Sequence, residues 1–321
     1  MNYFKTCVLL AGLTALLGFL GNMLGGAEGT VIMLGIGALI NFFTYWNADK
    51  MVLRAYNARE VDSRTAPGYY GIVAKLAESA NLPMPKVYIV DNPQPNAFAT
   101  GRNPQNAAVA ATTGLLQMLS PRELVGVMAH ELAHVKNRDT LIMTVAATVS
   151  GAISTLARFS LIFGGSQDSD NTRSNPLVAI LTAFLAPIAA MILQMAISRS
   201  REYAADRMGA KIARDPRGLA SALLKISGSV DRIPNYTAEN NPATASLFII
   251  NPLSGQKFDN LFTTHPAVEN RLAALHQLSQ EMQGISPLIS TESRSPFAYP
   301  HSKDIPQTDH PAPTRRRGPW G

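Results

Sequence analysis

The sequence of 321 residues contains one cysteine, Cys7, and few charged side chains. A single cysteine excludes an intramolecular disulfide and leaves no basis for cysteine-dependent zinc or thiol chemistry. Asp, Glu, Lys and Arg make up 16% of the chain, against about 25% in typical soluble domains. The chain is long enough to bury a core. The shortage of charge therefore indicates that part of the chain faces a membrane instead of water.

The basic residues are distributed in a way that argues against a nucleic-acid partner. Lys and Arg number 28 and Asp and Glu 22, which gives a formal net charge of +6. Nucleic-acid binding would require these charges to form a patch or stripe on one domain. Instead they gather beside apolar segments and in the terminal cluster Arg315–Arg317. This distribution favours contact with a lipid bilayer.

Four nearly charge-free stretches have about the length needed to cross a bilayer. They cover approximately residues 7–24, 30–46, 140–163 and 177–197. The first two predict a transmembrane hairpin within residues 1–47. A cleavable signal peptide is an alternative for the first stretch, because the small residues at positions 25–27 resemble a cleavage site.

The orientation of these spans follows from the positions of Lys and Arg. Basic residues concentrate before the first span, after the second, before the third and after the fourth. The two segments expected on the other side of the membrane, residues 25–29 and 164–175, contain three acidic residues and one basic residue. By the positive-inside rule, we expect both termini and the water-facing domain to lie in the cytoplasm.

The water-facing domain is expected to comprise residues 48–139 and 198–285, interrupted by the third and fourth spans within residues 140–197. A strand is expected at 86–90, a hairpin from 97–100 and 107–111, and helices at 68–81, 199–213, 216–231 and 267–282. Residues 286–321 read as a disordered tail. The predicted fold is an α-helical integral membrane protein with four transmembrane helices. It carries a mainly α, α+β cytoplasmic domain with a small β-sheet.

One helix of this domain has a well-defined start and carries a chemical motif. Ser120-Pro121-Arg122-Glu123 is a capping box with proline at the first helical position. His130-Glu131-Leu132-Ala133-His134 follows on the same helix. A spacing of four places both imidazoles on one helical face, where they can bind one metal ion.

Glu131 lies one step round this helix from the two histidines. There its carboxylate can act as general base on a metal-bound water, which predicts metal-assisted peptide hydrolysis. Two histidines facing solvent are the alternative. Apolar residues such as Val127 and Leu132 on the same helix disfavour it, because they indicate a packed element.

Catalytic zinc sites usually have three protein ligands, so a third ligand is needed. No histidine follows closely behind His134. The best candidate is Glu202, and Asp206 one turn later can hydrogen-bond a ligand histidine. An ordinary exposed acidic pair is the alternative. The predicted topology favours the metal site, because the third span begins just after His134 and the fourth ends just before Glu202.

These motifs occur in the order found in a known family. His130–His134 (HELAH) is followed by Asn137-Arg138-Asp139, by two apolar spans and by the segment 200–206 (SREYAAD). Over about residues 1–282 the sequence strongly resembles the HtpX membrane metalloproteases, which are gluzincins related to the CAAX prenyl proteases. The resemblance implies one Zn²⁺ bound by His130, His134 and Glu202, with Glu131 as the base.

The resemblance also implies roles that spacing alone does not reveal. The segment Asn96-Ala97-Phe98 looks like the family's edge strand, which pairs with an extended substrate peptide. His265 is similar to the histidine of a late His-Pro motif and would stabilise the developing oxyanion. Arg271 would organise nearby carboxylates, and Asp139 resembles a residue that supports the metal ligands from the helix end.

By resemblance, the protein is a zinc endopeptidase that cuts cytoplasmic segments of misfolded or damaged membrane proteins, in membrane quality control and the stress response. It would lie in the bacterial inner membrane as a multi-pass protein with a cytoplasmic active site. A CAAX-type processing enzyme is one alternative, although that branch carries more spans. A non-catalytic zinc-binding scaffold is another, but it would not need Glu131. Site-2-type proteases carry the motif within a span, whereas here the charged segment Lys136–Asp139 follows it.

Overall fold

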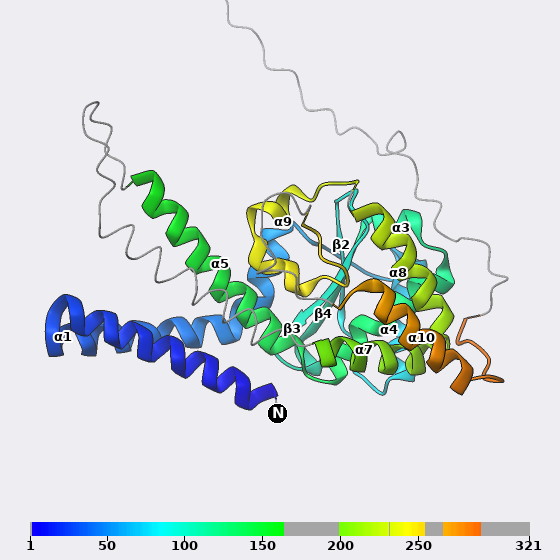
Figure 1. The fold of residues 1–321 in the computed structure, drawn as a ribbon, viewed down its shortest axis with the longest axis horizontal. Coiled ribbons are helices and arrows are strands. Elements are labelled where there is room, and N and C mark those ends of the chain that lie inside the picture. The colour runs from blue at the N-terminus through cyan, green and yellow to red at the C-terminus, as the bar shows by residue number, and fades with distance from the viewer. Residues whose placement is uncertain (1, 164–198, 231, 254–265, 290–321) are drawn as a thin grey trace, which may run out of the picture.

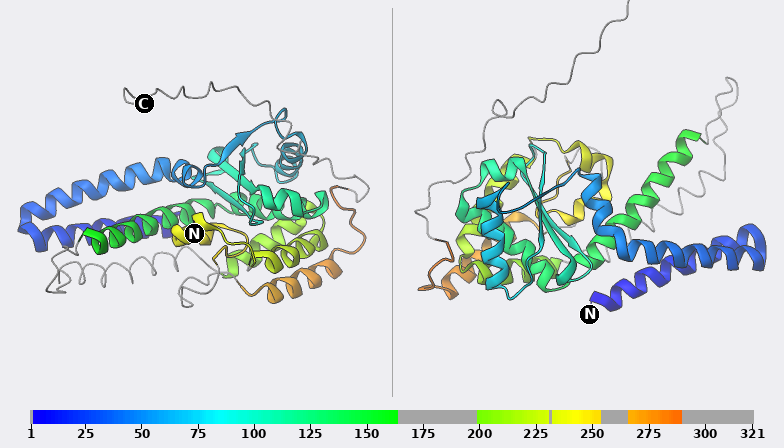
Figure 2. Two further views of the ribbon diagram at one scale, coloured as in Figure 1. Left: turned by 90° about the horizontal axis from the view of Figure 1, so that it is seen from above. Right: turned by 180° about the vertical axis from the view of Figure 1, so that it is seen from behind.

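The computed structural model describes residues 2–163, 199–230, 232–253 and 266–289 (Figure 1). The predicted fourth span at 177–197 lies outside the described residues, as does the tail from residue 290 onward. Two helices, α1 (Asn2–Ala55) and α5 (Thr140–Phe163), extend from one side of the domain (Figures 1 and 2). Four others gather on the other side: α4 (Pro121–Lys136), α7 (Arg199–Ala213), α8 (Pro216–Val230) and α10 (Val268–Glu281). The His130–His134 motif lies on the side where the helices gather.

The N-terminal hairpin is present as α1, Asn2–Ala55, which reverses direction at Gly25 and Gly26. Gly26 has a φ of 60°, in the left-handed region that favours glycine. The two arms pack so closely that a Cβ on Gly21 would lie 2.3 Å from the carbonyl oxygen of Gly29. A side chain larger than hydrogen would therefore force the arms apart.

Within the described residues, one helix is long and apolar enough to cross a membrane. It is Gly25–Ala55, the second arm of α1, and the first arm contains the shorter apolar helix Thr6–Phe19. The prediction of four transmembrane helices is therefore not confirmed.

The domain contains a four-stranded mixed sheet in the order β1-β2-β4-β3. Its strands are β1 (Arg59–Val61), β2 (Lys86–Val90), β3 (Ala97–Gly101) and β4 (Ala107–Thr112). Strands β2 and β4 are parallel, and the other pairs are antiparallel. The predicted hairpin is confirmed as β3 and β4, and it places β3 at the edge of the sheet. The short strand β1 has no counterpart in the prediction.

The two faces of the sheet pack against different layers. In β3 and β4, Ala97, Ala99 and Val109 belong to the core formed with α4 and α7, whereas Phe98 and Ala110 belong to a second core. This division follows from the alternation of side chains along a strand. The first layer contains α2 (Pro67–Ser79), α3 (Thr113–Met118), α4 (Pro121–Lys136), α7 (Arg199–Ala213), α8 (Pro216–Val230) and α10 (Val268–Glu281).

The second layer contains the end of α1, the start of α5 (Thr140–Phe163) and the end of η2 (Pro242–Leu247), a 3₁₀ helix. A short helix α9 (Tyr236–Asn240) precedes η2, and a 3₁₀ turn η1 (Pro104–Asn106) lies between β3 and β4. Helix α5 begins where the third span was predicted. However, residues 140–150 are buried, Thr148 in part, and the Thr144 hydroxyl lies 2.9 Å from that of Thr100 on β3. The apolar character of these turns is thus used in packing against the protein's own sheet.

The predicted capping box is confirmed at the start of α4. The Ser120 hydroxyl accepts from the Glu123 amide, and the Glu123 carboxylate accepts from the Ser120 amide at 2.9 Å. Glu123 is buried and also accepts from Ser221 and Lys225 of α8, at 2.6 and 2.8 Å. The cap therefore fixes the start of α4 and ties this helix to α8.

A glycine sets the spacing between α4 and α7. A Cβ added to Gly209 of α7 would lie 2.8 Å from the backbone nitrogen and Cα of His130 on α4. Real Cβ atoms do not approach backbone atoms this closely, so alanine at this position would require the two helices to separate.

We expect Gly209→Ala to lower the free energy of unfolding by about 1–3 kcal/mol, because overpacking costs about this much. Gly71→Ala in α2 is the matched control, since a Cβ there meets nothing within 4 Å. It should be neutral or raise stability by up to about 1 kcal/mol, from helix propensity. Denaturant unfolding of the purified protein, followed by circular dichroism, measures both. Equal losses in the two variants would contradict this role for Gly209.

Candidate metal centre

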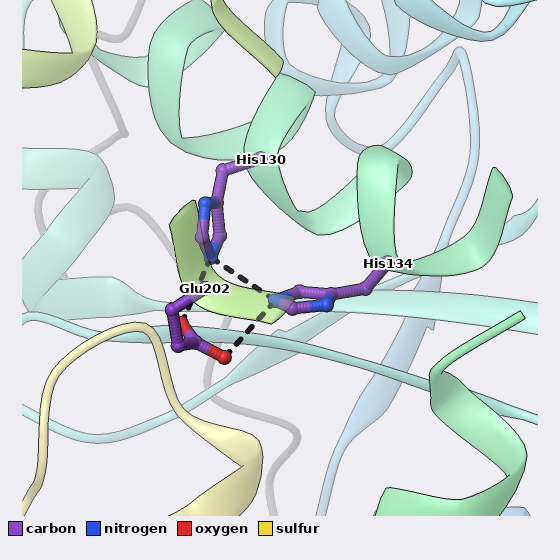
Figure 3. Close-up of side chains that lie close together, drawn as sticks. All are labelled: His130, His134 and Glu202. Carbon is purple, nitrogen blue, oxygen red and sulfur yellow. Dashed lines mark hydrogen bonds and ion pairs between the residues drawn. The ribbon is translucent and has the colours of Figure 1, made fainter. Parts of the chain in front are cut away.

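Three buried side chains from two helices, His130 and His134 of α4 and Glu202 of α7, converge on one another (Figure 3). The Nε2 atoms of His130 and His134 lie 3.2 Å apart, as their spacing on α4 predicts. Glu202 of α7 places its two carboxylate oxygens 3.7 Å from His130 Nε2 and 3.6 Å from His134 Nε2. All three side chains are buried.

These distances suit one zinc ion. Zinc bonds of about 2.0–2.1 Å in tetrahedral geometry place two ligand atoms roughly 3.3 Å apart. The separations within the cluster of His130, His134 and Glu202 are close to this value. Two imidazoles and one carboxylate also form a ligand set typical of catalytic zinc, with a fourth position left for water.

Each histidine contacts a carboxylate through its other ring nitrogen. Asp206 lies 2.9 Å from Nδ1 of His130, and Asp139 lies 3.2 Å from Nδ1 of His134. Such contacts favour the tautomer that leaves Nε2 available to a metal, and they fix the orientation of the ring. Asp139 reaches His134 because α4 ends in a tight turn at Arg138, which has a φ of 58°.

Arg271 of α10 balances the charge of Asp206 in the interior. Its guanidinium, 1% exposed, donates two hydrogen bonds to Asp206, at 2.8 and 2.7 Å. Burial alone would raise the pKa of Asp206, but Arg271 and His130 hold it well below its usual range. The third hydrogen bond of Arg271 goes to the backbone oxygen of Ile249 at 2.8 Å. Arg271 therefore links the carboxylate behind His130 to the segment that contains Ile249.

Glu131 is buried beside the cluster, and its Oε1 has no hydrogen-bond partner. Burial raises the pKa of Glu131 to about 8, Glu202 adds to the increase, and His134 and the Ala99 amide on β3 oppose it. A buried carboxylate with an unpaired oxygen next to a metal cluster can accept a proton from a water molecule there.

The electrostatics of the cluster favour a bound cation. Burial lowers the pKa of His130. Burial also acts to lower the pKa of His134, but the carboxylates of Glu202, Asp139 and Glu131 outweigh it and raise that pKa to about 9. The concentration of negative charge around His134 therefore attracts either a proton or a metal ion.

The remaining candidate residues have different positions. Ala97 and Phe98 begin β3, and Asn96 directly precedes it. All three are buried and already paired with residues 248–250. The sequence prediction missed this pairing, although the apolar run at 247–250 is a signal that could have indicated an extended segment. His265 lies outside the described residues.

We expect Arg271→Met to lower the free energy of unfolding by about 3–5 kcal/mol, because Asp206 would keep a buried charge without its partner. Arg207→Met is the matched control. Arg207 pairs with Glu281 on the same two helices, but these side chains are 59% and 45% exposed, so the change should cost less than about 1 kcal/mol. Denaturant titration of both proteins measures the difference. Similar stabilities would contradict the role assigned to Arg271.

Two comparisons found known proteins to which this chain is similar. The model of a family described as "Peptidase family M48" matches residues 64–279. This range includes both helices of the metal cluster. Among solved structures, the crystal structure of S. mikatae Ste24p is similar, with a TM-score of 0.46 and 16% sequence identity. The match covers 85% of this chain and 65% of that chain.

Proposed function

The chain belongs to peptidase family M48, a family of zinc-dependent metalloproteases, and we propose that it is a membrane-bound zinc endopeptidase whose metal is held by His130, His134 and Glu202. The observation that carries this proposal is the position of Glu131. A structural zinc site needs ligands only, whereas here a buried carboxylate with an unpaired oxygen lies beside the ligands.

Each residue of the site has its own role in the proposed peptide hydrolysis. When bound, zinc supplies Lewis-acid polarisation of the peptide carbonyl and lowers the pKa of water to about 7. Glu131 takes a proton from the attacking water at its carboxylate and delivers it to the leaving amine nitrogen. Asp206 and Asp139 hold the two imidazoles in position, and Arg271 keeps Asp206 ionised.

We further propose four spans, a cytoplasmic active site and a place in the bacterial inner membrane. The second arm of α1 supports membrane insertion, because only 6% of its apolar 18-residue stretch is buried in the protein. Its large apolar side chains, including Phe42, Phe43 and Trp46, are exposed. Trp46 stacks against the guanidinium of Arg102 at 4.4 Å, an arrangement suited to the membrane interface.

The proposed substrates are misfolded or damaged membrane proteins, cut in their cytoplasmic segments as part of quality control and the stress response. The connection between hairpin and site supports this substrate class. The end of α1 packs on the same sheet as the metal-site helices, and α5 begins at Thr140, directly after Asp139. A site so close to an apolar hairpin is well placed to act on chains emerging from the same bilayer.

We expect Glu131→Gln to retain zinc and to lose cleavage of an unfolded test protein by about 10²–10⁴-fold, the range for removing a general base. Glu202→Ala should lose zinc as well as activity. Glu269→Gln, on the exposed start of α10, is the matched control and should keep both. Metal analysis and cleavage assays of detergent-purified protein, stripped with chelator and reloaded with zinc, measure these outcomes. Absence of cleavage by zinc-loaded, folded wild type would favour a non-catalytic scaffold.

The proposed topology predicts opposite accessibility for two exposed positions. With Cys7 replaced by serine, a single cysteine at position 28 should react with a membrane-impermeant maleimide in intact spheroplasts. A cysteine at position 64 should react only after permeabilisation, because it would lie on the cytoplasmic side. Glu28 and Arg64 are both exposed, so burial does not limit either reaction. Equal labelling of both positions in intact spheroplasts would contradict the topology.

A further inference from the structure

The metal cluster is closed to a polypeptide in this structure. His130 and Glu131 are 1% exposed, and His134 and Glu202 are 4% exposed. An extended substrate must bring a peptide carbonyl to these side chains. Some part of the surrounding chain therefore has to move before cleavage. The ligands themselves sit on α4 and α7, whose contact is fixed by Gly209, so the movable part must be sought elsewhere.

The edge of β3 that faces away from β4 is the place where an extended peptide would pair. Strand β4 occupies one edge, and in their antiparallel register Thr112 donates to the Asn96 oxygen. Backbone groups alternate along such a pair, so those of Ala97 and Ala99 point to the other edge. That edge borders the cluster, because the Ala99 amide interacts with Glu131.

The chain's own residues 248–250, here called the covering segment, already occupy this edge. Phe248 forms an antiparallel bridge with Phe98, and the Ile249 amide donates to the Ala97 oxygen at 3.1 Å. The Asn96 side-chain amide donates to the Ile250 oxygen at 2.9 Å. These are the backbone and side-chain groups that a paired substrate strand would use.

The covering segment is held by side chains as well as by backbone pairing. The rings of Phe98 and Phe248 lie 5.3 Å apart in an edge-to-face arrangement, and Tyr56, the residue directly after α1, packs against both. The Tyr56 hydroxyl also hydrogen-bonds Thr244 in η2. Through these contacts of Tyr56, the end of the N-terminal hairpin helps to keep the covering segment in place.

We propose that the covering segment is an autoinhibitory strand, which occupies the substrate-pairing edge of β3 and must leave it before a polypeptide can reach the metal centre. It is suited to leaving because a single bridge, not a ladder, joins it to β3. Its release would also free Arg271 from the Ile249 oxygen while its two bonds to Asp206 remain. This inference rests on the proposed peptidase function.

A reversible cross-link tests the proposal. Phe98→Cys and Phe248→Cys, combined with Cys7→Ser, would place two thiols at directly opposed positions of an antiparallel bridge, where a disulfide can form. We expect the oxidised protein to keep its zinc but to cleave an unfolded test protein at least about tenfold more slowly than after reduction, because the open state is removed. The two single-cysteine variants are the matched controls and should not respond to oxidant.

A second readout does not depend on cleavage. Removal of zinc by 1,10-phenanthroline should be slower in the oxidised than in the reduced double-cysteine protein, since the chelator needs the same opening. Equal chelation rates, or undiminished cleavage by the fully oxidised protein, would overturn the proposal. Absence of cleavage by zinc-loaded wild type would instead count against the peptidase function, and the chelation rates would still decide whether the segment closes the site.

A variant that weakens the attachment of the covering segment should raise activity, whereas the cross-link should lower it. Tyr56→Phe keeps the ring but removes the hydrogen bond to Thr244, so the covering segment should open more often. We expect kcat/KM to rise about fivefold, the effect of one hydrogen bond. Tyr236→Phe, at a side chain that is 75% exposed, is the control and should leave kcat/KM unchanged. Unchanged or lower kcat/KM in Tyr56→Phe would show that Tyr56 does not hold the site closed.

Discussion

The close contact between α4 and α7 is the constraint on which the metal centre depends. At Gly209 the absence of a side chain lets α7 approach the backbone of His130. Only at this separation do the carboxylate oxygens of Glu202 come within 3.6–3.7 Å of the two imidazoles. Both helices are held from outside the site, α4 by its cap and its bonds to α8, and α7 through the Asp206–Arg271 pair.

The sheet joins this centre to the N-terminal hairpin. Because side chains alternate along a strand, β3 presents Ala99 to the metal-site layer and Phe98 to the layer built from α1 and α5. The backbone of the same strand faces both Glu131 and the covering segment. A displacement of Tyr56, directly after α1, would therefore be transmitted through the packed aromatic rings to Phe98 of β3. Phe98 is the residue before Ala99, whose amide interacts with the proposed base Glu131.

Several elements could be predicted from the sequence because their signals are local. The capping box at Ser120 and the β3–β4 hairpin depend on residues within a few positions of one another, and both are present. The start of α5 shows what local signals do not distinguish. An apolar sequence gives the same helical signal whether the helix faces lipid or packs on a sheet. Residues 140–150 of α5 pack against the sheet and α1. The covering segment could not be placed either, because its partner strand lies about 150 positions earlier in the chain.

The sequence by itself determined the core of the candidate site, because helical periodicity alone places His130, Glu131 and His134 around one point. It also indicated Glu202 as the third ligand, through the order of motifs. Tertiary structure decided how close Glu202 comes and which carboxylate contacts each imidazole. It also decided that residues 248–250 occupy the edge of β3 at which substrate pairing is proposed. These outcomes depend on packing between segments far apart in the chain, and no local pattern of residues specifies such distances.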